Sequence, residues 1–107
     1  MAYDEDLADR IRVLAGGAVE KKMFGGLAFL VGGNMSVAAS GQGGLMVRVD
    51  PSQTEALLAE PGAEPFEMRG REMAGWLRVS AEAVESDEDL RRWVDRGVAY
   101  ARSLPPK

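Results

Sequence analysis

Pairs of glycine divide the first half of this chain into short apolar runs, and this spacing constrains the fold more than any other feature. The pairs at 25–26 and 32–33 and the glycine-rich stretch 40–44 separate four runs of residues: 19–24, 27–31, 35–39 and 45–49. Glycine adopts the positive φ angles of hairpin turns at little cost, and short apolar runs between such turns are typical of strands. These turns are too short for a helical crossover between parallel strands. The pattern therefore predicts a four-stranded antiparallel meander.

Amphipathic helices are predicted at the two ends of the chain. Over residues 4–15, apolar side chains recur every three to four positions, acidic residues occupy the first turn and a glycine pair follows. Over residues 86–104, Ser86 precedes an acidic first turn and an apolar stripe, and Pro105 follows the last turn. Acidic residues favour the positive end of a helix dipole, and glycine or proline commonly follows the last turn. Both segments thus carry start and stop signals.

A third, shorter helix is predicted after the meander. Asp50 is its expected N-cap, Pro51 occupies the first helical position and Gln53 is placed to close a capping box. Pro61 ends this helix, because the residue before a proline is pushed out of the helical region.

Two further strands, 65–68 and 73–79, are predicted between this short helix and the last one. Because the strands are grouped and joined by hairpins, the element order predicts an α+β fold. We expect an antiparallel sheet of about five or six strands, flanked by N- and C-terminal helices and a short middle helix. A chain of 107 residues accommodates one domain, 1–107, with 104–107 as a tail.

Alternation along the predicted strands sorts side chains onto two faces of the sheet. We expect the core face to receive Leu45, Val47, Val49, Met73, Leu77 and Val79. The opposite face receives Met46, Arg48, Trp76 and Arg78. In one interpretation, the arginine stems lie over the Trp76 ring and their charged ends reach water. In the other, the four side chains form a surface for a protein partner, since Trp, Met and Arg are enriched at the cores of interfaces.

The predicted sheet segments also carry several basic residues. On an open sheet they would form a local basic patch, whose candidate phosphate contacts are Lys21, Lys22, Arg69 and Arg71 together with Arg48 and Arg78. The alternative is that they lie scattered or pair with helix carboxylates, because neighbours in a strand point to opposite faces. With 17 acidic and 13 basic residues, the net charge of −4 disfavours non-specific nucleic-acid binding.

Several kinds of catalytic and metal site are excluded by composition. The chain has neither Cys nor His, which excludes disulfides, thiolate or imidazole metal sites and a Ser-His-Asp triad. The glycine-rich turns lack the Lys-Ser/Thr that follows a phosphate-binding loop. Candidate acids such as Glu64, Glu67 and Glu72 lie in a polar stretch near turns. We therefore expect no enzymatic activity, no cofactor and no metal.

The segments needed for membrane insertion or export are not found in this sequence. The longest apolar run, 27–31, is far shorter than the roughly 20 residues of a membrane helix. The first ten residues are acidic and lack the pattern of a signal peptide. We expect a cytoplasmic protein without membrane contact.

An ordered set of short motifs along nearly the whole chain resembles the N-terminal domain of the TfoX/Sxy proteins. The set comprises Met23-Phe24-Gly25-Gly26, Met35, Leu45 with Arg48-Val49-Asp50, Pro65-Phe66, Met73 with Gly75, and Leu90 with Trp93. The resemblance implies an α+β domain, a bacterial source and a role in regulating natural-competence genes. Full-length relatives act with the cyclic-AMP receptor protein and carry a C-terminal helical domain with DNA-binding character. The sequence in hand ends at Lys107 without it, and we expect a stand-alone N-terminal domain.

Three functional hypotheses follow from the sequence. The first is a non-catalytic protein–protein interaction and regulatory module, homodimeric, whose partners are a second copy and a transcription factor. The second is a nucleic-acid-associated regulator that uses the basic patch. The third is a small-ligand-binding domain.

Overall fold

The computed structural model describes residues 3–23, 25–41, 43–68 and 70–106. Its elements follow the predicted order, with one short helical turn added before the last helix. They are α1 (Glu5–Leu14), β1 (Val19–Met23), β2 (Gly26–Val31), β3 (Asn34–Ala39), β4 (Leu45–Arg48), η1 (Pro51–Gln53), α2 (Thr54–Leu57), β5 (Ala63–Met68), β6 (Arg71–Val79), η2 (Ala81–Val84) and α3 (Asp87–Ser103). The predicted α+β architecture is confirmed.

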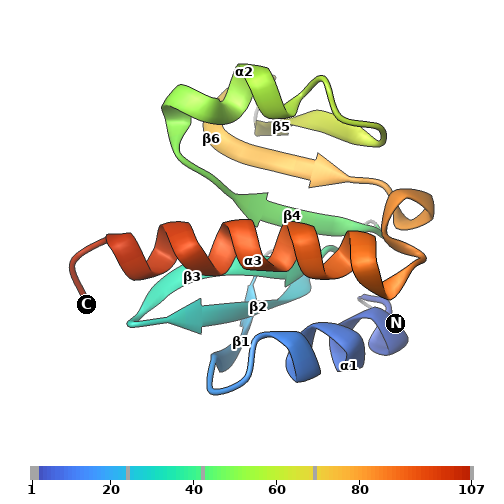
Figure 1. Ribbon diagram of the computed structural model, residues 1–107, viewed down its shortest axis with the longest axis vertical. Coiled ribbons are helices and arrows are strands. Elements are labelled where there is room, and N and C mark those ends of the chain that lie inside the picture. Colours follow the sequence, from blue (N-terminus) through green and yellow to red (C-terminus); the bar gives the residue numbers. More distant parts are fainter. Residues whose placement is uncertain (1–2, 24, 42, 69, 107) are drawn as a thin grey trace.

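The six strands form one antiparallel sheet in the order β1-β2-β3-β4-β6-β5. The first four strands are the predicted meander, of which residue 24 lies outside the described residues. The strand pair β5–β6 joins the meander through its second strand, because β6 pairs with β4 and β5 lies at the edge. Helix α3 lies across the middle strands and α1 lies beside it on the same face of the sheet (Figure 1).

Two glycines explain the first hairpin. Gly25 has a φ of +75°, which L side chains rarely adopt. A Cβ at Gly26 would lie 2.2 Å from the carbonyl oxygen of Ala39 on β3, so only glycine lets the strands approach this closely. Gly25 lies in a turn as predicted, whereas Gly26 is the first residue of β2 and pairs with Met23.

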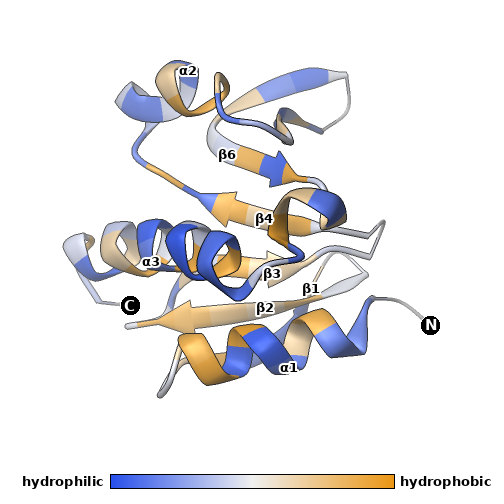
Figure 2. Ribbon diagram, turned by 45° about the vertical axis from the view of Figure 1, so that its right-hand side comes forward, coloured by the Kyte–Doolittle hydropathy of each residue, from blue (hydrophilic) through white to orange (hydrophobic). Residues whose placement is uncertain are grey.

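The core lies between the helices and one face of the sheet. Helix α1 contributes Leu7 and Ile11, and α3 contributes Leu90, Trp93 and Val94. The predicted core-face residues of β4 and its extension, Leu45, Val47 and Val49, are buried against these helices together with Leu77 and Val79 of β6. In Figure 2, hydrophobic colours run along much of β2–β4, whereas hydrophilic and hydrophobic residues alternate along α1 and α3.

Met73 is a correction, because its side chain is 38% exposed and does not join the core. The register of β5 and β6 shifts between Leu77 and Glu72, and Gly75 has a φ of +88°, so the alternation that places Leu77 on the core face is interrupted before Met73. The helices that bury Leu77 and Val79 do not extend over Met73.

The short middle helix has the predicted N-cap, Asp50, but it lacks the expected capping box. The carboxylate of Asp50 accepts hydrogen bonds from the backbone N–H of Ser52 (2.9 Å) and from its hydroxyl (2.8 Å). These two bonds lower the pKa of Asp50. Gln53, which was expected to close a capping box, makes no side-chain hydrogen bond to the described chain, and the helical segment starts as a 3-10 turn.

The predicted tail at 104–107 is partly anchored. The side-chain amide of Asn34 donates a hydrogen bond to the carbonyl oxygen of Pro105 (3.0 Å). This bond ties the end of the chain to the start of β3. Residue 107 lies outside the described residues.

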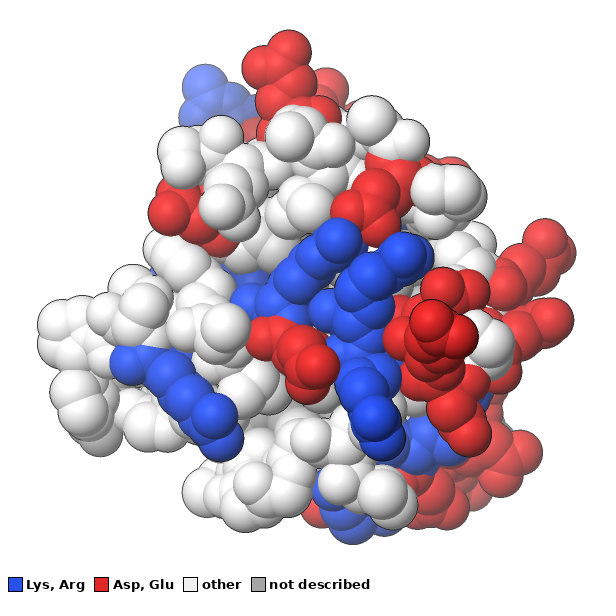
Figure 3. All heavy atoms as spheres, in the orientation of Figure 1, with Lys and Arg blue, Asp and Glu red and all other residues white. Residues whose placement is uncertain are grey.

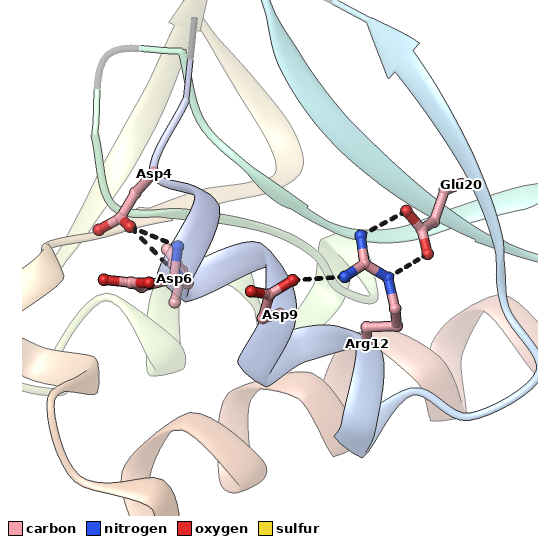
Figure 4. Close-up of polar contacts among 6 residues, drawn as sticks. Asp4, Asp6, Asp9, Arg12 and Glu20 are labelled. Atoms are coloured by element: carbon pink, nitrogen blue, oxygen red, sulfur yellow. Dashed lines mark hydrogen bonds and ion pairs between the residues drawn. The ribbon is translucent and has the colours of Figure 1, made fainter. Parts of the chain in front are cut away.

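An arginine clamp ties α1 to the edge strand β1 (Figure 4). The Nε and Nη2 groups of Arg12 donate to the two carboxylate oxygens of Glu20, and Nη1 donates to Asp9. These bonds lower the pKa of Glu20 and raise that of Arg12. The clamp therefore stabilises the fold above the ordinary pKa of a glutamate, about 4.3, and this contribution is lost as the pH falls through the lowered pKa.

We expect Glu20→Gln to reduce the acid sensitivity of the fold. The melting temperature of the variant should fall less between about pH 5 and pH 3 than that of the wild type, because the variant has no carboxylate to protonate. The effect at neutral pH should be small, since the clamp is exposed to solvent. Thermal unfolding across this pH range measures it. Glu72→Gln is the control, since Glu72 makes no ion pair with the described chain; identical curves for both variants would contradict the prediction.

Candidate interaction surface

The second face of the sheet has its own apolar cluster, separate from the core. Its apolar cluster consists of buried Ala28, Met35, Ala38 and Met46, with partly buried Met23, Leu30, Phe66 and Trp76 packed against them. Every member lies on a strand, whereas the core cluster on the other face includes residues of α1 and α3. We call the surface formed by these eight residues the helix-free face. In Figures 1 and 2, α1 and α3 lie together on the opposite side of the sheet.

The register of β4 and β6 brings together the four residues that alternation had placed on one face. Met46 pairs with Arg78, and Arg48 pairs with Trp76. Met46 is buried, whereas Arg48, Trp76 and Arg78 are half-buried. The predicted arrangement of these side chains is therefore present, with Met46 as its floor and the other three at its surface.

Arg48 lies between two aromatic rings at the end of β4. Its guanidinium carbon is 5.5 Å from the ring centroid of Trp76 and 5.6 Å from that of Tyr100 on α3. Phe66 also lies against Trp76, with ring centroids 6.2 Å apart and planes inclined at 44°. Arg48 therefore contacts Trp76 through its guanidinium, whereas the sequence interpretation placed the stem over the ring and the charged end in water. A guanidinium flanked by rings in this way is held in place by cation–π attraction.

Sequence reasoning missed two members of this aromatic group, Tyr100 and Phe66. Tyr100 lies on the flank of a predicted amphipathic helix, and its contact with Arg48 depends on how that helix lies across the sheet. Phe66 belongs to a strand whose register with β6 shifts between Pro65 and Glu67. The signal that could have identified Phe66 was its place in a predicted strand next to the predicted strand that carries Trp76.

The candidate phosphate contacts do not gather into one patch. Strand β1 is at one edge of the sheet, and β6 is four strand spacings away, roughly 19 Å. Lys21 pairs with Ala28 and so faces the helix-free side, whereas Lys22 pairs with Leu27 of the core face. Arg71 lies at the start of β6, and Arg69 lies outside the described residues. The described members are therefore divided between two faces and two ends of the sheet.

Both edge strands carry features that oppose pairing with another strand. Strand β1 contains Lys21 and Lys22, both exposed, and β5 contains Pro65, which has no N–H to donate to a ladder. Charged residues and proline at sheet edges are common protection against edge-to-edge association. The helix-free face is thus a better contact region than either edge.

Within the described ranges, no group of three or more acidic residues lies close enough to hold a metal ion. In Asp50, whose pKa is lowered, Oδ1 accepts both Ser52 hydrogen bonds at the start of η1. The same part of the chain contains no helix with the length and apolar character needed to cross a membrane.

The fold and this surface define a class of protein: a small α+β domain whose antiparallel sheet has one helix-covered face and one helix-free face. The chain belongs to the TfoX N-terminal domain family, whose model matches residues 12–101. Membership points to a competence-related regulatory domain. No curated protein and no solved structure matches the chain.

Proposed function

We propose that this chain is a non-catalytic protein-interaction module that takes part in transcription regulation and contacts its partner through the helix-free face. The observation that carries the proposal is the apolar cluster built from strand residues alone, with Trp76 and Phe66 half-buried at its surface. An apolar sheet face with aromatic and arginine side chains has the composition of an interface core. Family membership supports the regulatory part of the proposal.

A nucleic-acid partner has less support than a protein partner. The described candidate phosphate contacts lie at separate ends of the sheet, and the net charge of −4 repels a phosphate backbone.

Site-specific photo-crosslinking in the native host tests the proposal. We expect p-benzoylphenylalanine at position 76 to crosslink a protein, because Trp76 lies on the helix-free face. The same group at position 13 is the control, since Val13 is an apolar residue of α1, 81% exposed. Denaturing electrophoresis measures the adducts. Equal adducts at both positions, none at position 76, or an adduct removed by nuclease would contradict the proposal.

A further inference from the structure

We infer that the partner of the helix-free face is an acidic peptide segment with apolar side chains, and that Arg48 binds one of its carboxylates. This inference rests on the proposed function and adds the chemistry of the partner. Its basis is the combination of an arginine held between two rings, the distribution of ion pairs over the molecule and the apolar cluster beside them.

The guanidinium of Arg48 can donate hydrogen bonds, but no described residue accepts one. Trp76 and Tyr100 flank its guanidinium, which restricts the motion of the group. The side chain donates no hydrogen bond to a described residue and has no described carboxylate within 4 Å. A guanidinium presents its N–H groups in one plane and matches a carboxylate bidentately. Because the rings already hold it, less side-chain entropy is lost when an anion binds.

Arg48 differs from the paired arginines of the helices in having no acidic partner among the described residues. All described ion pairs have their basic member on a helix: Arg10 and Arg12 on α1, and Arg92 and Arg96 on α3. Figure 3 views the helix side, where basic and acidic side chains lie next to one another. On the sheet, Arg78 faces Glu64 in register and Lys21 lies on the far edge strand β1, whereas Arg48 makes no ion pair with the described chain. The unpaired guanidinium of Arg48 fits a carboxylate of a partner.

A second copy of the chain fits this face poorly. A two-fold interface places the same surface on both sides, so the surface offered to Arg48 would itself carry an unpaired arginine. Opposed like charges disfavour such an interface. An acidic segment from another protein has no such penalty, and its apolar side chains can cover Phe66, Trp76 and Leu30.

A single-stranded nucleic acid also fits poorly. Proteins of that kind stack bases on free aromatic rings. Trp76 already has Arg48 over its ring and Phe66 against it. The ring that would hold a base is therefore occupied by contacts within the chain.

Selection from a displayed library of random 12-residue peptides tests the inference on the full chain. We expect the wild type to select peptides rich in Asp and Glu together with aromatic or aliphatic residues. A selected peptide, synthesised with a fluorescent label, should bind roughly tenfold or more weakly to the Arg48→Gln/Arg78→Gln variant, because charge-assisted hydrogen bonds are lost. Binding should also weaken as salt is raised. Fluorescence anisotropy measures both effects.

The control is Arg71→Gln/Arg91→Gln, which removes the same charge from two exposed arginines that make no described ion pair and lie outside the surface. It should change binding by less than about twofold. Arg48→Lys keeps the charge and removes the planar fork, so it should bind with intermediate strength. Melting temperatures of all variants establish that they are folded.

Three outcomes of the binding experiments would overturn the inference. They are selection of neutral or basic peptides, equal weakening by the control variant, and Arg48-dependent binding of a labelled single-stranded 12-mer of DNA. A dimer that depends on Trp76, found by sedimentation, would assign the face to a second copy. A crosslink at position 76 that survives Arg48→Gln/Arg78→Gln would leave the interaction module standing and reject the acidic partner, so the two failures are distinguishable.

Discussion

Replacing Trp93 with alanine should lower the free energy of unfolding by about 3–5 kcal/mol. Trp93 is fully buried in the middle of α3, where it packs in the main core between the two long helices and the sheet. Its ring also lies 4.6 Å from the guanidinium carbon of Arg96. The substitution removes the largest buried side chain and leaves a cavity that the surrounding sheet cannot close. A domain of this size has about 5–15 kcal/mol of total stability, so the loss is a large fraction of it.

Urea unfolding followed by circular dichroism measures this loss. Trp76→Ala is the matched control, because it truncates the same residue type where the ring is half-exposed. We expect the control to lose less stability, since less apolar area leaves the interior. Equal losses for the two variants would mean that α3 does not seal the core through Trp93.

The second large effect is expected at Gly97, where α3 comes closest to the sheet. A Cβ at this position would lie 2.4 Å from the carbonyl oxygen of Ser36 and 2.7 Å from Cγ1 of Val37. Alanine is favoured over glycine inside a helix by about 1 kcal/mol, which opposes the steric cost. Because the nearest atom belongs to the backbone of a buried strand and cannot move aside cheaply, the steric cost should prevail. We expect Gly97→Ala to lower the free energy of unfolding by roughly 1–3 kcal/mol.

Gly16→Ala separates the steric effect from the general effect of replacing glycine. A Cβ at Gly16 meets nothing within 4 Å, and its φ is outside the left-handed region. The control should be close to neutral in the same urea experiment. A Gly97→Ala variant as stable as the wild type would show that α3 can move away from β3 at little cost.

Part of the arrangement of the helix-free face could be predicted from the sequence, and part of it could not. Alternation alone places Met46 and Arg48 on one side of β4, because side chains of a strand point to opposite faces in turn. Alternation fails at Met35 and Val37, which lie on opposite faces although they are two residues apart. The register of β2 and β3 shifts there, and the hydroxyl of Ser36 bonds to the carbonyl oxygen of Phe29 (2.8 Å). Such a bulge leaves no clear mark in the sequence.

The exposure of Met73 illustrates a second limit of sequence reasoning. The alternation from Leu77 is interrupted where the register of β5 and β6 shifts, and burial also requires another element above the side chain. Which stretch of a sheet a helix covers depends on the lengths and directions of elements far apart in the chain. For the same reason, the contact between Arg48 and Tyr100 could not be predicted from the sequence.

The sequence by itself determined the order of the elements, the hairpins at the glycine turns, the caps of α1 and α3 and the family, because these depend on residues close together in the chain. The tertiary structure alone decided that β6 pairs with β4, that both long helices cover one face, and that Arg48 lies between Trp76 and Tyr100. These features join residues distant in sequence. They are set by how the apolar surfaces of whole elements bury one another, which no local pattern specifies.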